Sequence, residues 1–418
     1  MIMRLHHRPA LWTMAIAVAA TAIPLSAQDV DWSGGIRPRF EARAFDDGPT
    51  PTFVSMRTRI ELRAVVNPYA RIFVQVQDAR LWGDETGVKD GSADQLDLHQ
   101  AYLDVGHRGE SPLFLRAGRQ EAEWAEARLV GTPTFSQIGN AYDGVLAAIR
   151  LGERGMLDLF GYQLREAEAP IHSSDRALFG AWAELPLGTA EASAGGASEG
   201  PTGSLQLFAL HDRDNLDRRA TRRTTLGAYL LGDLGPLSAR IEGALQRGDL
   251  QGFDLSADML NGRVTLPVFE RRGDLTIWYD RYSGDADAFA TDGAPTGAFD
   301  DLFGRNHRFL GFADLFGDVP AATRGRGIQD VALRLGWGVL DGGRLGADLH
   351  RFLVTDDAGL AGGTLADELD LFLRLPTTWT GFDLLAGVSA VWAGDAGRAL
   401  GAVPSDQFYG YLQLDAVF

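Results

Sequence analysis

Charged and mostly apolar residues alternate strictly from residue 56 to residue 64. In an extended chain, successive side chains point to opposite faces, so this segment has one charged face and one apolar face. The charged face comprises Arg57, Arg59, Glu61 and Arg63. The other face comprises Met56, Thr58, Ile60, Leu62 and Ala64. A helix cannot separate the two sets, because residues two apart lie on nearly opposite sides of it, so the pattern predicts a β-strand.

The preceding segment repeats this alternation. Its charged positions are Arg37, Arg39, Glu41 and Arg43, and they alternate with Ile36, Pro38, Phe40, Ala42 and Ala44. In a soluble sandwich, the charged faces would meet bulk water and the apolar faces would meet a core. In a membrane barrel, the charged faces would line a lumen and the apolar faces would meet lipid. Alternation alone leaves both architectures open.

The connections between strands distinguish the two architectures. From residue 28 onward we count eighteen candidate strands. Short turns follow even-numbered strands, at residues 67–68, 107–111, 152–155, 232–236, 267–273, 340–343 and 376–380. Longer loops follow odd-numbered strands, at residues 46–53, 82–94, 123–141, 166–176, 212–222, 283–326, 355–364 and 393–406. The connection 186–202 is an exception, since it is long and lies on the short-turn side.

Outer-membrane barrels show this asymmetry, with an even number of strands, short periplasmic turns and long extracellular loops. The sequence therefore predicts an all-β fold, a transmembrane antiparallel up-and-down β-barrel of eighteen strands. Residues 28–418 would form this single domain, with a long extracellular loop at 283–326.

The two ends of the chain indicate export to the outer membrane. Residues 1–27 are typical of a cleaved secretory signal peptide, because Arg4 and Arg8 precede a short apolar run that ends in small residues. No later segment offers about eighteen consecutive apolar residues, so spanning helices are excluded. The chain ends on the aromatic Phe418, which resembles the terminal residue that the bacterial outer-membrane assembly machinery recognises. We expect a monomer in the outer membrane of a Gram-negative-type bacterium, surrounded by lipid and lipopolysaccharide.

Composition narrows the class of partner. The chain has no cysteine, so a closed hydrogen-bonded framework would have to supply the stability that disulfides give to small secreted domains. A formal net charge of −17 argues against nucleic acid as a partner. Lys89 is the only lysine among 39 basic residues. Arginine is suited to fixed, multidentate contact with carboxylate or phosphate, so the placement of the arginines matters more than the net charge.

The arginines on strands are the candidate binding residues. A charge that faces lipid at the bilayer midplane costs about 2–4 kcal/mol, so we expect these side chains to face the lumen. The predicted lumen set is Arg37, Arg39, Arg43, Arg57, Arg59, Arg63, Arg116, Arg150, Arg240, Arg334 and Arg374, together with Glu41 and Glu61. The carboxylates of Glu242, Asp330, Glu368 and Asp370 would share the lumen.

Two roles remain open for any single arginine of this set. Guanidinium groups in an aqueous pore attract anions, but arginine–carboxylate pairs can also neutralise one another and only brace the wall. On the first two strands, six arginines against two carboxylates favour anion handling.

The long loop 283–326 carries candidate gating residues, which are Asp285, Asp287, Arg305, Asn306 and His307. Its first residues place carboxylates at alternate positions, but they lack the spacing and the terminal glutamate of an EF-hand. We therefore predict a solvated loop, no metal site and no cofactor. No serine stands beside a histidine in a recognisable hydrolase motif, so no enzymatic activity is predicted.

Two groups of sequence blocks carry a resemblance to a known family. The first group is VQVQDARLW at 74–82, LHQAYLD at 98–104, LRAGRQE at 115–121, RLVG at 128–131 and AYDG at 141–144. The second is WYDRYSGD at 278–285 and FDDLFGRNHRFLGFAD at 299–314. In order and spacing they resemble the alginate export family of outer-membrane barrels, although Gly304 stands where that family often has proline.

The resemblance implies an eighteen-stranded channel with an arginine-rich lumen, and alginate or a similar acidic polysaccharide as the exported cargo. We predict a channel through which anionic solutes diffuse passively. The alternatives are an uptake porin for small anions or oligosaccharides, and a structural or enzymatic barrel with a plugged lumen.

Overall fold

The structure is a computed structural model that describes residues 29–45, 50–83, 96–166, 175–188, 202–215, 220–287, 296–340, 342–377 and 381–418. The predicted signal peptide, residues 1–27, lies outside the described residues. So do residues 288–295, which belong to the predicted gating loop.

Eighteen strands make up most of the described chain. The first nine are β1 (Asp29–Phe45), β2 (Thr52–Asn67), β3 (Ala70–Leu81), β4 (Leu96–Val105), β5 (Leu113–Gln120), β6 (Tyr142–Leu151), β7 (Gly155–Arg165), β8 (Arg176–Leu187) and β9 (Thr202–Asp214). The other nine are β10 (Thr221–Leu234), β11 (Leu237–Leu250), β12 (Phe253–Val268), β13 (Gly273–Tyr282), β14 (Ile328–Val339), β15 (Gly343–Val354), β16 (Thr364–Pro376), β17 (Phe382–Ala393) and β18 (Gln407–Val417). Short helical segments are η2 (Phe269–Arg271), η3 (Asn306–Arg308), α1 (Val319–Ala322) and α2 (Asp395–Leu400).

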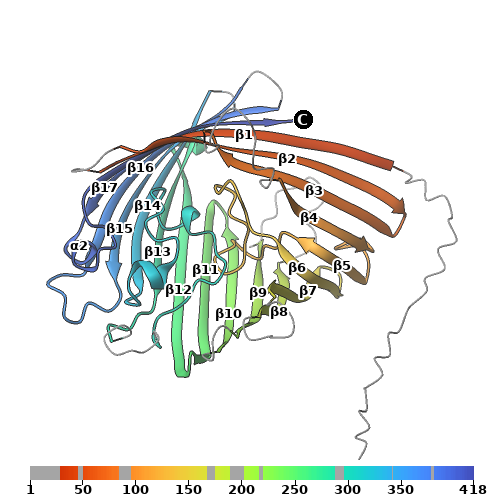
Figure 1. The fold of residues 1–418 in the computed structure, drawn as a ribbon, viewed down its shortest axis with the longest axis horizontal. Coiled ribbons are helices and arrows are strands. Elements are labelled where there is room, and N and C mark those ends of the chain that lie inside the picture. Colours follow the sequence, from red (N-terminus) through yellow and green to blue (C-terminus); the bar gives the residue numbers. More distant parts are fainter. Residues whose placement is uncertain are drawn as a thin grey trace, which may run out of the picture.

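The strands form one closed antiparallel sheet. Each strand pairs with the next one along the chain. The last strand, β18, pairs with β1, and the two lie side by side in Figure 1. Closure leaves no unpaired strand edge. The predicted eighteen-stranded barrel is therefore confirmed.

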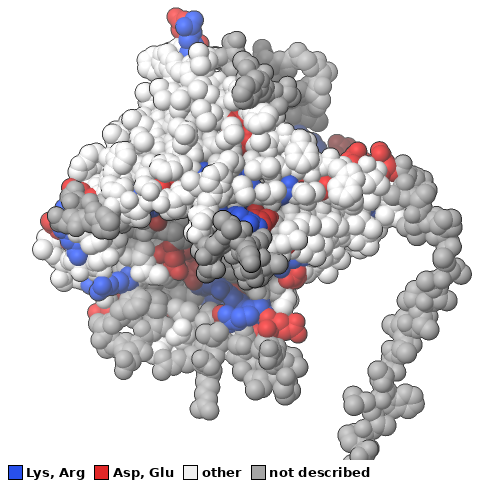
Figure 2. Space-filling view, turned by 45° about the horizontal axis from the view of Figure 1, so that its top comes forward, with Lys and Arg blue, Asp and Glu red and all other residues white. Residues whose placement is uncertain are grey.

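Side chains alternate across the wall. On β1, Ile36 and Phe40 are exposed on the outside, whereas Arg37 and Arg39 are 7% and 5% exposed on the inside. The outer wall carries few charged atoms in the space-filling view (Figure 2). An outward apolar face matches the hydrocarbon of a bilayer, and a closed sheet satisfies every ladder hydrogen bond within the wall.

No helix among the described residues is long and apolar enough to cross a membrane.

Connections differ in length between the two ends of the barrel, as predicted. One exception is the link between β11 and β12, which falls on the long-loop side and consists only of Gln251 and Gly252. Both residues have positive φ, 57° and 95°, as a tight two-residue hairpin requires. The ladder of β11 and β12 therefore runs up to the turn, where Leu250 pairs with Phe253.

Two long loops fold into the barrel instead of standing above it. They are the β5–β6 loop (residues 121–141) and the described part of the β13–β14 loop (residues 283–287 and 296–327), seen inside the ring of strands in Figure 1. Val130 and Phe303 form a parallel β-bridge that joins the two loops. Gly131 N donates to Phe303 O at 3.1 Å, and Phe303 N donates to Leu129 O at 2.9 Å. The entry of the β5–β6 loop into the lumen was not predicted from the sequence.

Apolar side chains bury these loops against the inner wall. Trp124, from the first loop, stacks on Phe160 of β7 with ring centroids 4.1 Å apart and on Trp182 of β8 at 6.1 Å. Phe316, from the second loop, packs on Phe352 of β15. The hydrophobic core therefore lies between the loops and the inner wall, so the lumen is narrowed by packed structure.

Candidate functional site

A cavity of about 1040 Å³ remains between the two inner loops and the wall formed by β1 and β2. Its charged lining residues are Arg37, Arg39, Glu41, Arg80, Arg305, Arg308, Asp314, Arg334 and Asp415. Arginines thus outnumber carboxylates six to three in this lining. We call this narrow part of the lumen the constriction.

Two arginines of β1 hold the β5–β6 loop in the lumen. Arg37 Nη1 donates to Thr134 O and Arg37 Nη2 donates to Ser136 O, both at 2.6 Å. Arg39 Nη1 donates to Phe135 O at 2.6 Å, while its guanidinium carbon lies 3.8 Å from the centre of the Phe135 ring. Both arginines face the lumen, as predicted. Their donors are committed to loop carbonyls, a tethering contact that alternation could not reveal.

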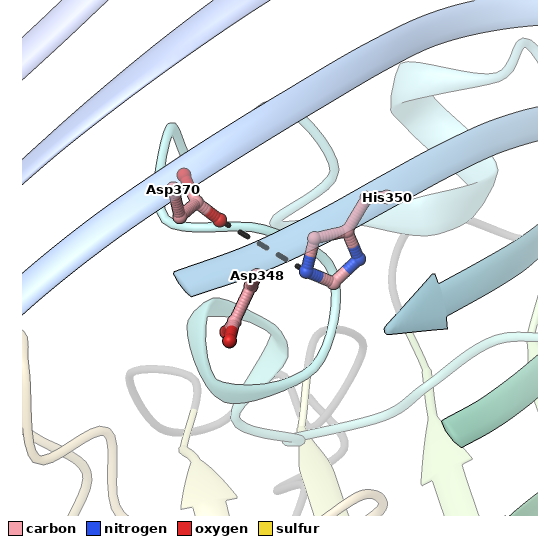
Figure 3. Close-up of side chains that lie close together, drawn as sticks. All are labelled: Asp348, His350 and Asp370. Carbon is pink, nitrogen blue, oxygen red and sulfur yellow. Dashed lines mark ion pairs between the residues drawn. The ribbon is translucent and has the colours of Figure 1, made fainter. Parts of the chain in front are cut away.

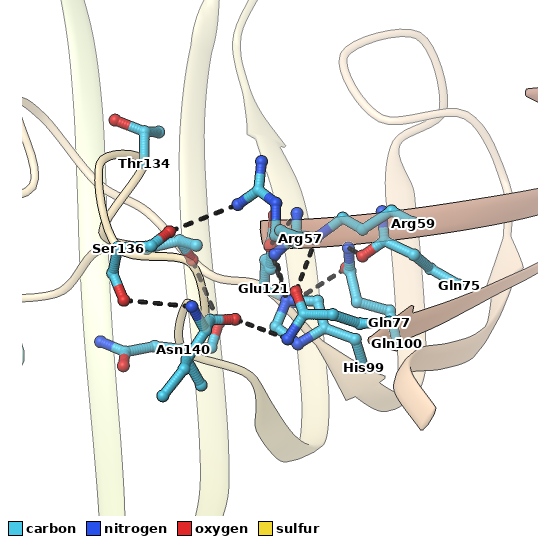
Figure 4. A network of polar contacts seen from close by, with 12 residues as sticks. Arg57, Arg59, Gln75, Gln77, His99, Gln100, Glu121, Thr134, Ser136 and Asn140 are labelled. Atoms are coloured by element: carbon cyan, nitrogen blue, oxygen red, sulfur yellow. Dashed lines mark hydrogen bonds and ion pairs between the residues drawn. The ribbon is translucent and has the colours of Figure 1, made fainter. Parts of the chain in front are cut away.

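Arg59 of β2 belongs to a polar network that anchors the start of the same loop (Figure 4). Its Nη1 lies 3.1 Å from Glu121 Oε1, and its Nε donates to Gln77 at 2.8 Å. His99 Nε2 lies 2.8 Å from the same Glu121 oxygen. Burial raises the pKa of Glu121, but the His99 hydrogen bond and the Arg59 charge outweigh it, so the pKa lies below the ordinary value. Glu121 is therefore a fixed anion at neutral pH.

Arg57 lies beside this network with few contacts of its own. Its Nη1 donates to Ser136 O at 3.5 Å, the limit of a hydrogen bond (Figure 4). It forms no ion pair within the part of the chain that the structure describes. The Arg57 side chain lines a second cavity of about 280 Å³, and Arg37 lines both cavities. Arg57 therefore lies in the second cavity, beside the constriction, with most of its guanidinium donors unused.

The remaining arginines of the predicted set are engaged by neighbouring groups. Arg43 donates to Ala313 O, and Arg150 donates to Glu110 O. The ion-paired residues are Arg63 with Glu61, Arg116 with Asp104, Arg240 with Glu126, Arg334 with Asp348, and Arg374 with Asp383. Arg150 and Arg374 lie at the short-turn end, away from the constriction. The structure thus brings Arg37, Arg39 and Arg334 to the constriction, and it brings Arg57 and Arg59 to the second cavity beside it.

The predicted gating residues fall into two groups. Asp285 accepts from Thr296 at 2.9 Å near the start of the β13–β14 loop, and the Asp287 amide donates to Asp285. His307 stacks on Phe135 with ring centroids 3.7 Å apart, and its Nδ1 lies 2.9 Å from Asp314. Arg305 and Asn306 precede His307 in the constriction lining. Residues 305–307 therefore lie where the two inner loops meet, whereas Asp285 and Asp287 lie outside the cavity.

Sequence reasoning predicted Arg305 of the β13–β14 loop as a gating residue, but it missed Arg128 of the β5–β6 loop. Arg128, in the β5–β6 loop, is buried and donates to Asp280 of β13 at 2.7 Å. Its guanidinium carbon also lies 3.8 Å from the centre of the Phe309 ring, in the other loop. Arg305 pairs with Glu123 at 2.9 Å, which again links the two loops. The RLVG block containing Arg128 was a visible signal, but strand alternation assigns no direction to a loop residue.

The closed wall, the apolar outer face and the narrowed polar lumen define an outer-membrane β-barrel channel. The family model described as alginate export matches residues 34–409, so the chain belongs to the alginate export family. The predicted family and the predicted outer-membrane location are thereby confirmed.

Solved channel structures share the fold. Pseudomonas aeruginosa OpdO is 15% identical with a TM-score of 0.62, over 94% of this chain and 98% of that one. P. aeruginosa OccK11 (OpdR) is 15% identical with a TM-score of 0.57, over 93% and 96%. P. aeruginosa OpdK, solved with vanillate, is 12% identical with a TM-score of 0.61, over 93% and 98%. No curated protein matches the chain in sequence.

Proposed function

We propose that this channel conducts small anionic solutes passively, and that Arg57, in the second cavity beside the constriction, is the main contact for them. The supporting observation is that Arg57 has no carboxylate partner among the described residues, while its neighbours Arg37, Arg39 and Arg59 are engaged. A guanidinium with unused donors can bind a carboxylate in bidentate fashion. One weak site of this kind attracts an anion without trapping it, as conduction requires.

The volume of the constriction supports small cargo. A cavity of about 1040 Å³ suits a solute of a few rings or sugar units, since ordinary ligand pockets span about 300–1,000 Å³. Arg37 and Arg39 pin the β5–β6 loop across the lumen, and this loop would oppose threading of a long polymer. Small carboxylates, such as aromatic or uronic acids, are the cargo class that we favour.

Alginate export is the second candidate. The family description supports it, and a polyuronate carries the same carboxylates that Arg57 would bind. Liposome swelling separates the candidates. We expect vanillate and monomeric uronates to enter faster than neutral solutes of equal size, with rates that fall steeply for uronate trimers. Equal rates for monomers and trimers would favour the polymer channel.

Ion selectivity in planar bilayers tests the role of Arg57. We expect the unaltered channel to prefer chloride over potassium, and Arg57→Gln to lower that preference about fivefold, since a charge at 4 Å is worth about 1 kcal/mol in water. The matched control is Arg351→Gln, which removes an arginine that is 62% exposed on the outer face of β15. Cation preference in the unaltered channel, or equal effects of both variants, would refute the proposal.

A further inference from the structure

Four ionisable side chains form a square on the inner face of two neighbouring strands. Asp348 and His350 lie two apart on β15, and Glu368 and Asp370 lie two apart on β16. In the strand register, Asp348 is directly opposite Asp370, and His350 is directly opposite Glu368. All four are buried, with exposures of 5% or less. Like charges directly opposite one another destabilise a sheet, so the arrangement calls for a compensating cation.

The side chains around the square do not supply enough positive charge. Asp330 of β14 adds a fourth buried carboxylate next to Asp348, Glu368 and Asp370. Arg334 is the only arginine in ion-pairing distance of these carboxylates within the described chain, and it is committed to Asp348. Asp280, on the next strand, is already paired with Arg128. Burying carboxylates without partners is strongly unfavourable.

His350 is oriented as a metal ligand would be. Its Nδ1 lies 2.8 Å from Asp330 Oδ2. The other ring nitrogen, Nε2, is therefore left for the carboxylates of the square. Nε2 lies 3.9 Å from Asp370 Oδ2 (Figure 3). Metal-binding histidines in proteins characteristically donate their other ring nitrogen to a carboxylate, which fixes the ring and its tautomer.

Unpartnered carboxylate oxygens belong to the same group of residues. Asp370 Oδ1, Glu368 Oε2 and Asp330 Oδ1 are buried and have no hydrogen-bond partner in the part of the chain that the structure describes. Each of these residues is at most 1% exposed. A native structure seldom leaves three such oxygens together without a ligand.

We propose that Asp348, His350 and Asp370 bind a divalent transition-metal cation. One ligand atom from each lies within 4.8 Å of the others, and ligands about 2.1 Å from a shared ion lie at most about 4.2 Å apart. In tetrahedral coordination the ligand atoms would lie about 3.4 Å apart, so closing the site takes side-chain movements of up to about 1 Å. One imidazole with carboxylates suits zinc or a similar ion better than calcium, which prefers six or more oxygens.

The site would fasten the β13–β14 loop to the wall. Phe312 N donates to Asp370 Oδ2 at 3.2 Å, and Ala313 N donates to Glu368 Oε1 at 2.9 Å. A cation that fixes Asp370 therefore also fixes the loop backbone at Phe312, in the loop that narrows the lumen. Asp330 acts as a positioning residue, since it holds the imidazole without binding the metal.

Metal content of the purified full-length barrel tests the proposal. After chelator treatment and dialysis against zinc chloride, we expect about one tightly held Zn²⁺ per barrel, measured by mass spectrometry. The double variant His350→Gln/Asp370→Asn should lose this ion. The control His307→Gln, which removes a lumen histidine paired with Asp314, should keep it. Absence of stoichiometric zinc in the unaltered barrel, or equal retention in the double variant, would overturn the site.

A second readout does not depend on a variant that folds. Titration of the unaltered barrel with Co²⁺ should give a visible absorption band typical of nitrogen and oxygen ligands, and zinc should displace it while calcium should not. In Asp330→Asn, the affinity should fall about 10–100-fold with the same final band. Absence of the band, or displacement by calcium, would contradict the proposal.

Discussion

Asp301 is a carboxyl group buried inside the β13–β14 loop. Burial raises its pKa most, the neighbouring Asp300 charge raises it further, and the Asn306 amide that donates to it lowers it, so the pKa reaches about 7. Asp300 has the opposite environment, because Arg223 Nη1 lies 2.5 Å from Asp300 Oδ2. This charge holds the pKa of Asp300 below the ordinary value despite burial. Adjacent carboxyls thus titrate in different pH ranges.

The raised pKa of Asp301 predicts that stability falls as pH rises. Between an unfolded pKa near 3.8 and the folded pKa of about 7, the native state holds more protons than the unfolded state. Stability is therefore lost across this window, by up to about 4 kcal/mol, and is constant above it. We expect the unfolding midpoint to be higher at pH 5 than at pH 8, and Asp301→Asn to remove most of that difference. An unchanged difference in the variant would contradict the assigned pKa.

Individual arginines of the lumen differ because each reaches different acceptors. Arg37 and Arg57 are cross-strand partners in the register of β1 and β2. Arg37 finds three loop carbonyls and the side chain of Gln137, whereas Arg57 finds one carbonyl at 3.5 Å. Removing Arg37 would leave buried acceptors without hydrogen bonds, which would cost about 1–3 kcal/mol of stability for each acceptor. The two residues therefore occupy equivalent positions in the alternating pattern of their strands, but they have different partners in the folded protein.

At the scale of elements, the β13–β14 loop depends on one close approach. Gly311 has φ of 82°, and a Cβ added there would lie 2.5 Å from a Glu368 carboxylate oxygen. That carboxylate accepts from Ala313 N at 2.9 Å. The loop backbone can therefore reach the wall only where no side chain intervenes.

Gly311→Ala should cost more stability than Gly359→Ala. Gly359 has a similar φ of 77° but nothing within 4 Å of its Cβ position, so its variant isolates the backbone cost of about 1 kcal/mol. Gly311→Ala adds displacement of Glu368 and loss of its buried hydrogen bond, for a total of about 2–4 kcal/mol. Urea unfolding in lipid vesicles measures the stability cost of each variant. Hydrogen exchange should localise the effect of Gly311→Ala to residues 306–316. Equal costs would show that the Glu368 contact is dispensable.

The whole barrel closes at the pair of β1 and β18. Gly34 N donates to Phe418 O at 3.1 Å, and Phe418 N donates to Gly34 O at 3.0 Å, so the last residue completes the ladder. The Phe418 ring lies over Gly34, where an added Cβ would be 2.6 Å from it. The ring is nevertheless 77% exposed, which leaves it accessible to a partner during assembly.

We expect Phe418→Ala to impair assembly more than stability. The backbone bonds to Gly34 do not need the ring, so the purified variant should unfold near the midpoint of the unaltered barrel. If the assembly machinery reads the terminal aromatic, the amount of folded barrel in outer membranes should fall several-fold. Phe408→Ala is the control, since Phe408 is 48% exposed at the other end of β18. Equal yields from both variants would rule out a special role for Phe418.

The sequence by itself determined the wall of this barrel. Alternation has a period of two and depends only on local geometry, so it correctly assigned Ile60 to the outside and Arg37 to the inside. Strand number and most connection lengths followed, because turns and strands are both local features. The sequence blocks also identified the family.

Only the tertiary structure decided what the lumen contains. The partners of Arg37 are loop residues about 100 positions away, and the contact that joins Val130 to Phe303 spans an even longer stretch of chain. Asp348, His350 and Asp370 meet because strand register sets which residues of β15 and β16 are opposite. Loops have no fixed periodicity, so their direction depends on what they pack against. Alternation showed which side chains face inward, and the folded loops decided which of them remain available to a solute.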